Sequence, residues 1–200
     1  MPTRLLPLAA MIVLLASCRR ADRAGDRGAA VSVTRADSCA ARDPAVTAAG
    51  VGQARLHARI ATLPRGCVAR DSAWSSEGSP ERGTIVRVGA HEVLAVTTGT
   101  RDSSIQRVVV TDPALRAPGD AGVGSTVDAL RRGHAPLCAL AGEGRVALVA
   151  GDLPGLSFIT DAAPAALPRG ATPARAAAEL PGRTLVTTVL VTGVAPACTD

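Results

Sequence analysis

The sequence predicts an α+β fold of two tandem units, each a short helix followed by an antiparallel sheet. Three observations lead to this expectation. Short segments rich in Val, Leu and Ile alternate with turns that contain Gly and Pro, which is typical of antiparallel strands. Two stretches have the end signals of short helices. The same order of features occurs in residues 44–118 and again in residues 119–200.

The two units share sequence features as well as element order. At a shift of 67 residues, apolar positions in 56–66 fall on apolar positions in 123–133, and Arg-Gly closes both stretches. Further along, Val-Val-Val-Thr at 108–111 recurs as Val-Leu-Val-Thr at 189–192, where the shift has grown to 81. Tandem duplication explains this order, and chance similarity in a chain rich in Ala, Val and Gly is the alternative.

Each unit is expected to begin with a helix, at residues 54–63 in the first and 125–132 in the second. The second helix starts at Ser125, which opens a Ser-Thr-Val-Asp capping box. A third helix is expected at 172–180, because Thr172 followed by proline is a typical helix start. This Ala-rich helix should lie against the edge of the sheet.

Strands rich in β-branched residues are expected after the helix of each unit. They form two sets of three, and the third helix falls between the last two strands. The predicted strands are residues 84–88, 92–97, 105–111, 145–150, 156–160 and 184–192.

Residues 1–17 have the three parts of a secretory signal peptide: a positive Arg4, an apolar run over 5–15, and a pair of small residues. The run is shorter than the roughly 20 residues that a membrane-spanning helix needs. Leu-Ala-Ser-Cys at 15–18 resembles the lipobox of bacterial lipoproteins. The resemblance implies that the preceding peptide is removed and that Cys18 carries acyl chains such as palmitate. An ordinary signal peptide, with this cysteine as a bystander, is the alternative.

The lipobox resemblance also implies a place in the bacterial cell envelope. Several acyl chains hold a protein at a membrane surface, whereas one chain, at about 0.8 kcal/mol per buried CH₂, anchors it only marginally. Residue 19 is Arg, not the Asp that is linked to retention in the inner membrane, so the outer membrane is favoured. Residues 18–43 mix charges with Ala and Gly, which predicts a flexible tether.

The remaining cysteines predict two disulfide bonds. Cys39, Cys67, Cys138 and Cys198 are an even count in an oxidising compartment, and they allow three pairings. We expect Cys39–Cys67 and Cys138–Cys198, because each pair then lies within one unit. Metal ligation is the rival interpretation, but the sequence has no C-x-x-C spacing and no histidine close to two of these cysteines.

The composition argues against a nucleic-acid partner. The formal net charge is +5, but the arginines are scattered among acidic residues, and Trp74 and Phe158 are the only aromatic residues. Binding to nucleic acid needs basic clusters and aromatic stacking platforms. With so few aromatics, the core must be built from Val, Leu, Ile and Ala.

The sequence contains no complete catalytic motif, and we expect no catalytic residue, metal or cofactor. Residues 119–126 match the P-loop pattern except that Ser125 replaces the lysine that contacts phosphate. Ser157 stands in a G-x-S-x-G pattern whose last glycine is absent. The three histidines lie far apart, without the spacing of metal ligands.

Trp74 is the candidate binding residue. It is the only tryptophan, it has polar neighbours on both sides, and tryptophan is enriched at binding hot spots. One large side chain in an aromatic-poor protein also suits the core, so both roles stay open.

The order of helix and strands over residues 46–198 resembles two groups of proteins. One is the small lipoprotein of the outer-membrane assembly machine, and the other is the secreted β-lactamase inhibitor protein, a tandem duplication with a concave sheet. Fold alone does not fix function. With the anchor, this predicts a membrane-anchored envelope lipoprotein that is a non-catalytic binding or structural module for a protein or an envelope polymer. A periplasmic hydrolase that uses Ser157 or a histidine is the alternative.

Overall fold

The computed structural model describes residues 39, 44–76, 79–97, 104–142, 144–194 and 198. These residues all belong to one compact unit. The predicted signal peptide, the lipidation site Cys18 and, apart from Cys39, the predicted tether lie outside the described residues. None of the helices within the described ranges is long and apolar enough to cross a membrane.

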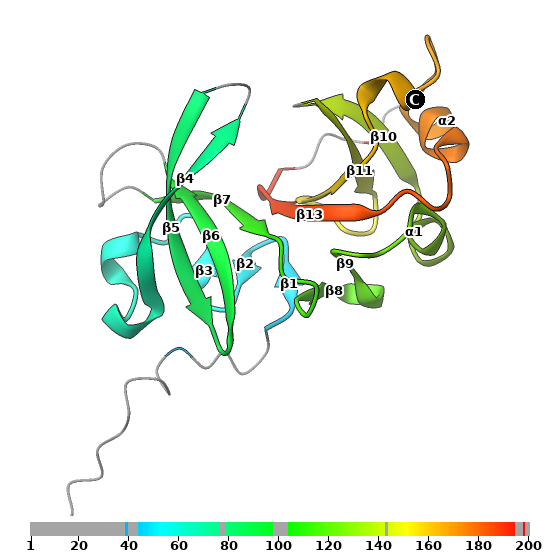
Figure 1. Ribbon diagram of the computed structural model, residues 1–200. Coiled ribbons are helices and arrows are strands. Elements are labelled where there is room, and N and C mark those ends of the chain that lie inside the picture. The colour runs from blue at the N-terminus through cyan, green and yellow to red at the C-terminus, as the bar shows by residue number, and fades with distance from the viewer. Residues whose placement is uncertain are drawn as a thin grey trace, which may run out of the picture. The chain divides into compact units, whose positions relative to one another are not determined.

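An eight-stranded antiparallel sheet dominates the unit, with the spatial order β10-β11-β12-β13-β7-β6-β5-β4 (Figure 1). It consists of two four-stranded meanders, each in chain order, that join where β7 pairs with β13. Together with two α-helices, this sheet confirms the predicted α+β class. The first meander is β4 (Val68–Ser76), β5 (Ser79–Val88), β6 (His91–Thr97) and β7 (Ile105–Val110), and the second is β10 (Leu137–Gly142), β11 (Arg145–Ala150), β12 (Leu156–Thr160) and β13 (Val186–Val191).

Shorter elements precede each meander. Before the first are β1 (Val46–Thr47), β2 (Gly50–Val51) and β3 (Ala54–Arg55), which form a small sheet, and 3₁₀ turns at Ile60–Thr62 and Arg65–Cys67. Before the second are the hairpin of β8 (Arg116–Ala117) and β9 (Ala121–Gly122), joined by a 3₁₀ turn at Pro118–Asp120, and then α1 (Val127–Gly133). A further 3₁₀ turn at Pro164–Ala166 and α2 (Pro173–Glu179) lie between β12 and β13.

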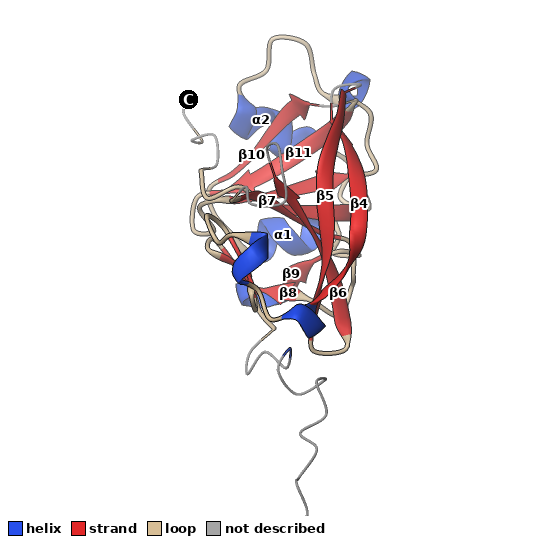
Figure 2. Cartoon of the chain, turned by 90° about the vertical axis from the view of Figure 1, so that its left-hand side faces the viewer, coloured by secondary structure: helices blue, strands red, loops and turns tan. Residues whose placement is uncertain are grey.

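Two of the three predicted helices are present. The N-cap of α1 is Thr126, one residue later than predicted, and its hydroxyl accepts the N–H of Ala129 at 3.1 Å. Ser125 instead accepts the N–H of Gly122, which closes the preceding turn. Thr172 caps α2 as predicted. This helix packs against β10 at the edge of the sheet, as Figure 2 shows.

The helix predicted at 54–63 is wrong. The segment forms β3, a turn and a 3₁₀ turn, because its backbone groups bond to other parts of the chain. His57 donates to the carbonyl of Ile105 at 2.8 Å, and the Ile105 N–H donates back to Ala58 at 2.9 Å. His57 also has a φ of 66°, which a right-handed helix cannot contain.

All six predicted strands are present, with ends that differ by a few residues from those expected. Besides the two-residue strands β1, β2, β3, β8 and β9, two strands of the large sheet, β4 and β10, were not predicted from the sequence. They are the two edges of the sheet, and each has few β-branched residues. Their strand conformation therefore depends on pairing with a neighbour more than on local preference.

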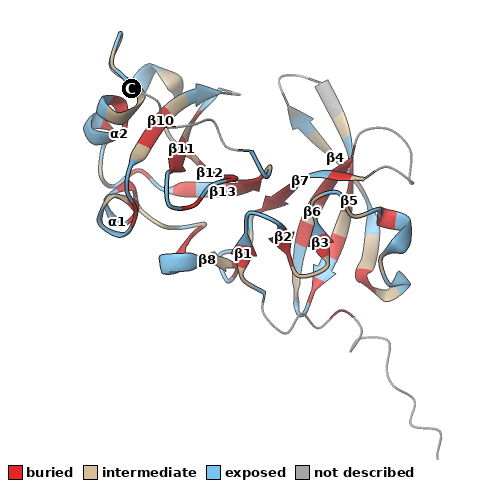
Figure 3. Cartoon of the chain, turned by 180° about the vertical axis from the view of Figure 1, so that it is seen from behind, coloured by how far each residue is buried: buried red, intermediate tan, exposed pale blue. Residues whose placement is uncertain are grey.

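The main core lies on one face of the sheet. Figure 3 shows buried residues along the strands of the sheet. The elements outside the meanders cover this face. Val51 from β2, Leu130 from α1 and Leu180 at the end of α2 are all buried in it, and Phe158 of β12 is its largest side chain.

Both predicted disulfide pairs are confirmed. Cys39 is bonded to Cys67, which directly precedes β4, and Cys198 is bonded to Cys138 on β10. The Cα–Cα distances are 5.2 and 5.7 Å. Each bond therefore ties the first strand of a meander to a segment near one end of the described chain.

Candidate functional site

The second face of the sheet, opposite the main core, carries Trp74 and is called the Trp74 face. Side chains of paired residues lie on the same face, and the strand registers align one continuous row across all eight strands. The row is Arg70, Ile85, Leu94, Val109, Leu190, Ser157, Val149 and Cys138.

A small apolar cluster lies at the centre of the Trp74 face. Val96, Val109 and Leu190 are its buried members, and Trp74 is among the partly buried residues packed against them. All of its members come from strands of the two meanders. The helices contribute to the main core instead, so the centre of the Trp74 face is covered by side chains of the sheet itself.

A hollow of about 750 Å³ lies on this face, and we call it the Trp74 hollow. Its apolar lining comes from both meanders. Strand β4 contributes Trp74, and the other meander contributes Ala147, Ile159 and Leu190. Ser157 and Arg145 add a hydroxyl group and a cation. An apolar wall with a few polar groups is typical of a binding site.

The indole nitrogen of Trp74 is the unusual atom of this site. Nε1 is buried and donates no hydrogen bond within the described part of the chain. A buried donor without an acceptor costs about 1–3 kcal/mol, so most buried donors are paired. Trp74 therefore packs against the apolar cluster, as the core interpretation expected, and its Nε1 lies beside a hollow with no acceptor among the described residues, so its binding role stays a prediction.

Arg145 is held at the rim of the Trp74 hollow. It is exposed, and its guanidinium donates to the carbonyl of Asp161 at 3.0 Å. One hydrogen bond leaves most of its five donors available. This residue can therefore meet a carbonyl, phosphate or carboxylate group on a bound molecule.

Ser157 lines the hollow but lacks the partners of a nucleophile. It is buried on β12, and among the described residues no histidine is hydrogen-bonded to it. Two histidines are paired elsewhere. Nδ1 of His91 lies 2.8 Å from Asp112, and Nδ1 of His134 lies 2.9 Å from Asp152. The geometry therefore gives no support to a hydrolase centred on Ser157.

Local packing and hydrogen bonds within the chain account for the conformation of the P-loop-like stretch at 119–126. Gly119 has a φ of 71°, and a Cβ there would meet the His134 ring at 2.8 Å, so this glycine is explained by local packing. The Ser125 hydroxyl is bonded to the N–H of Gly122, and the guanidinium of Arg116 donates to the Val123 carbonyl. Over the described ranges, no group of three or more potential metal ligands is present.

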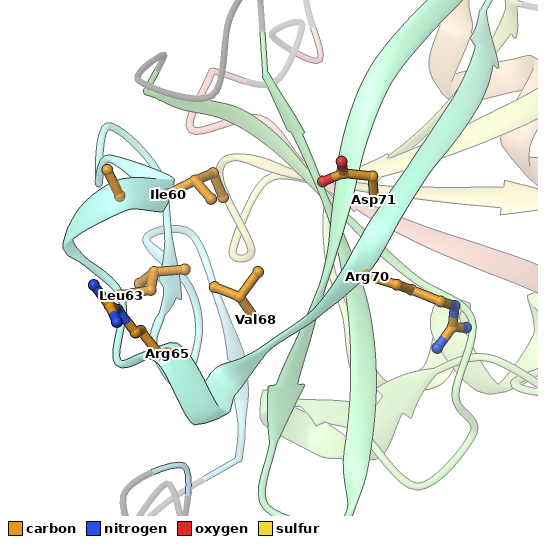
Figure 4. Close-up of a pocket in the computed structure, with 7 residues that line it drawn as sticks. Ile60, Leu63, Arg65, Val68, Arg70 and Asp71 are labelled. Atoms are coloured by element: carbon orange, nitrogen blue, oxygen red, sulfur yellow. The ribbon is translucent and has the colours of Figure 1, made fainter.

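A second hollow, of about 530 Å³, lies between the 3₁₀ turns and the start of β4, and we call it the edge hollow (Figure 4). Ile60, Leu63 and Val68 form its apolar side. Arg65 and Asp71 stand on opposite walls. Sequence reasoning missed this site because the segment was read as a helix.

Asp112 has a perturbed titration outside both hollows. The N–H of Ala114 donates to its carboxylate at 2.8 Å, and His91 bonds to the other oxygen. These hydrogen bonds, the backbone one first, favour the charged form and lower the pKa of Asp112 below its ordinary value.

The sequence identified Trp74 but not the residues that complete its hollow. Alternation along β12 places Ser157 and Ile159 on the face opposite Leu156 and Phe158, which could be read from the sequence once the strand was assigned. The contribution of β4 to the same hollow could not, because it depends on how the two meanders meet.

No family model matches the chain, and no curated protein matches it. Among solved structures, the chain is similar to the uncharacterized protein yfeY from Escherichia coli, with 18% sequence identity and a TM-score of 0.48. The similarity covers 74% of this chain and 99% of the other.

Proposed function

We propose that this protein is a lipid-anchored envelope protein whose folded unit is a non-catalytic binding module. The partner, a protein or an envelope polymer, contacts the Trp74 hollow. The buried Trp74 N–H, for which the described part of the chain offers no acceptor, is the observation that carries this proposal. A partner carbonyl or hydroxyl oxygen at that position would satisfy the donor, and apolar groups would cover Leu190 and Ile159.

The membrane anchor in this proposal is the acylated Cys18, in the outer membrane rather than the inner membrane. The residues at 15–18 and the Arg at position 19 support it. The two disulfide bonds agree with an oxidising compartment, where such bonds form and persist. The predicted tether at 18–43 would link the lipid to the binding module, with the disulfide-bonded Cys39 as its point of attachment to the folded unit.

The two units at 44–118 and 119–200 are proposed to be tandem copies of one ancestral unit. Each has a four-stranded meander with short hydrogen-bonded elements before it. The repeated segments at 108–111 and 189–192 lie on the paired strands β7 and β13. The helix of the second unit corresponds to 3₁₀ turns in the first, so the copies would have diverged most before their meanders.

Site-specific photo-crosslinking in the native envelope tests the binding role. A photoreactive amino acid replaces Ser75, which lines the Trp74 hollow, in the full chain. The matched control replaces Arg132, an exposed residue of α1, whose buried residues belong to the main core. We expect a discrete adduct of defined mass from position 75 and none from position 132.

The yield of the same adduct should fall strongly when Trp74 is replaced by Phe, which keeps an aromatic ring and removes the N–H donor. Equal labelling from positions 75 and 132, or no adduct from position 75 at any expression level, would overturn the proposal. The mass of the adduct distinguishes a polypeptide partner from a glycan or a lipid.

A further inference from the structure

Strand β4 is an edge strand with an open side. Within the described ranges it pairs with β5 alone. The other edge strand, β10, has α2 packed against it. An uncovered edge presents unpaired N–H and C=O groups to any extended chain.

The register identifies which backbone groups of β4 point outward. Ser75 pairs with Pro80, which has no N–H, so this pair cannot exchange two hydrogen bonds. Antiparallel ladders alternate hydrogen-bonded and non-hydrogen-bonded pairs. Trp74 therefore bonds to β5, while the N–H and C=O groups of Ala73 and Ser75 point away from the sheet.

The two hollows lie at opposite ends of this one strand. The edge hollow contains Val68 at its start, and the Trp74 hollow contains Trp74 near its end. At about 3.3 Å per residue, they are roughly 20 Å apart along the strand. An extended segment of seven to nine residues spans that distance, and its alternate side chains would point to the two faces of the sheet.

The edge hollow favours an apolar side chain with an acidic neighbour. Ile60 and Leu63 give it an apolar wall. Arg70 is already paired with Glu92 at 3.1 Å, and Asp71 has a partner of its own. Arg65, in contrast, is exposed and makes no ion pair with any described residue. An acidic group on a ligand can therefore pair with Arg65 at this hollow.

We propose that β4 receives an extended strand of a partner polypeptide. The strand hydrogen-bonds to Ala73 and Ser75, places an apolar side chain in the edge hollow and sets an acidic residue beside Arg65. Main-chain bonds supply affinity in such strand addition, and pockets for alternate side chains supply specificity. This inference rests on the proposed binding function and narrows its partner to an extended peptide segment.

A second copy of this chain fits the edge less well. Five of the nine residues of β4 are Ser or Ala, so two β4 strands paired with each other would bring few large apolar side chains to the edge hollow. Such small side chains leave a hollow of about 530 Å³ unfilled. A partner with larger apolar residues at alternate positions fills it.

A displayed library of random nine-residue peptides, selected on the full chain in detergent, tests the proposal. We expect the enriched peptides to share alternating apolar positions and at least one acidic residue. A synthetic copy of an enriched peptide should slow hydrogen exchange at the amides of Ala73 and Ser75. The absence of enrichment, or protection confined to other strands, would contradict strand addition.

Two pairs of variants locate the bound peptide. Ala73→Pro removes an outward N–H and spares the ladder with β5, so binding of the peptide should weaken at least tenfold. Ala73→Thr keeps the N–H and should bind within about twofold of the wild type. Arg65→Glu should weaken binding of acidic peptides at least fivefold, whereas Arg169→Glu, a control at another exposed arginine, should not.

Circular dichroism and intact disulfides serve as folding controls. If Ala73→Pro does not fold, the comparison of Arg65→Glu with Arg169→Glu tests the strand addition by itself. Unchanged peptide affinity in Arg65→Glu and in folded Ala73→Pro would overturn the inference. So would a β4-dependent dimer, detected by sedimentation, that excludes the peptide. A glycan or lipid adduct from position 75 would refute strand addition while leaving the binding function intact.

Discussion

Val109 stands directly opposite Leu190 in the ladder that joins β7 to β13, and both side chains belong to the cluster beneath Trp74. The two residues occupy the same place in the repeated segments 108–111 and 189–192. Their neighbours pair crosswise, Val108 with Val191 and Val110 with Val189. This is the pattern of a local two-fold axis through the Val109–Leu190 pair, and it places the axis in the middle of the Trp74 face.

The Val109–Leu190 pair should couple the two meanders energetically. Leu190→Ala removes a buried side chain and should lower the free energy of unfolding by about 2–4 kcal/mol. In urea denaturation, Val109→Ala and Leu190→Ala together should deviate from additivity by at least about 0.5 kcal/mol. Leu185→Ala, at an exposed position, is the control and should cost under about 1 kcal/mol. Strict additivity would argue against contact between the pair.

Trp74→Phe should separate stability from binding. The variant keeps a ring against the apolar cluster and removes a buried donor that has no acceptor among the described residues, so the free energy of unfolding should change by less than about 1 kcal/mol. Trp74→Ala, which also removes the ring, should cost about 2–4 kcal/mol. Chemical denaturation followed by circular dichroism measures both. A large loss of stability in Trp74→Phe would show that the N–H has an internal acceptor.

The two disulfides should contribute unequally to stability because they close loops of different length. The separations are 28 residues for Cys39–Cys67 and 60 for Cys138–Cys198. The chain-entropy model gives about 3.5 and about 4 kcal/mol respectively. Paired Cys→Ser variants, compared by denaturant unfolding under oxidising conditions, measure each contribution. Reductant should destabilise the wild type, whereas the stability of a variant that lacks both disulfide bonds should not change.

Asp112 should contribute to the pH dependence of stability. Folding lowers the pKa of Asp112, so its carboxylate stabilises the folded state at pH values above its ordinary pKa of 3.8. This stabilisation is lost as the pH falls through the lowered pKa. The loss of unfolding free energy between pH 5 and pH 2 should therefore be smaller in Asp112→Asn than in the wild type. Urea titrations across that range provide the measurement, and identical slopes would contradict the assignment.

Cys18→Ala should release the protein from membranes if the chain is a lipoprotein. The variant lacks the thiol that would be acylated, and the predicted signal peptide at residues 1–17 is unchanged. Fractionation should find the variant in the soluble envelope fraction and the wild type with membranes. The mass of the N-terminal peptide provides a second readout. An unchanged distribution and an unchanged peptide mass would refute the anchor.

Local signals in the sequence predicted the elements that depend on local chemistry. The strands at 145–150 and 156–160 carry β-branched or aliphatic runs, and Thr172 followed by proline marked the start of α2. The disulfide pairing followed from assigning each pair to one unit. The strands and the helix start need few contacts from distant parts of the chain, whereas the disulfide pairs join residues 28 and 60 positions apart and were predicted from the division into two units.

The errors arose where distant contacts decide the structure. Residues 54–63 have helical spacing, but bonds from His57 and Ala58 to Ile105 hold them otherwise. The edge strand β4 has a weak strand pattern and exists through its pairing with β5. The edge hollow lies between these two segments, so it could not be predicted from the sequence while both segments were assigned wrongly.

The Cys39–Cys67 bond has a mechanical consequence. A pulling force applied to the chain ahead of Cys39 crosses the sulfur–sulfur bond to Cys67 and arrives at the first residue of β4. The intervening stretch, which includes β1, β2 and β3, is thereby shielded from tension. In a stretching experiment, reductant should free an additional length of chain corresponding to this separation of 28 residues before the large sheet gives way.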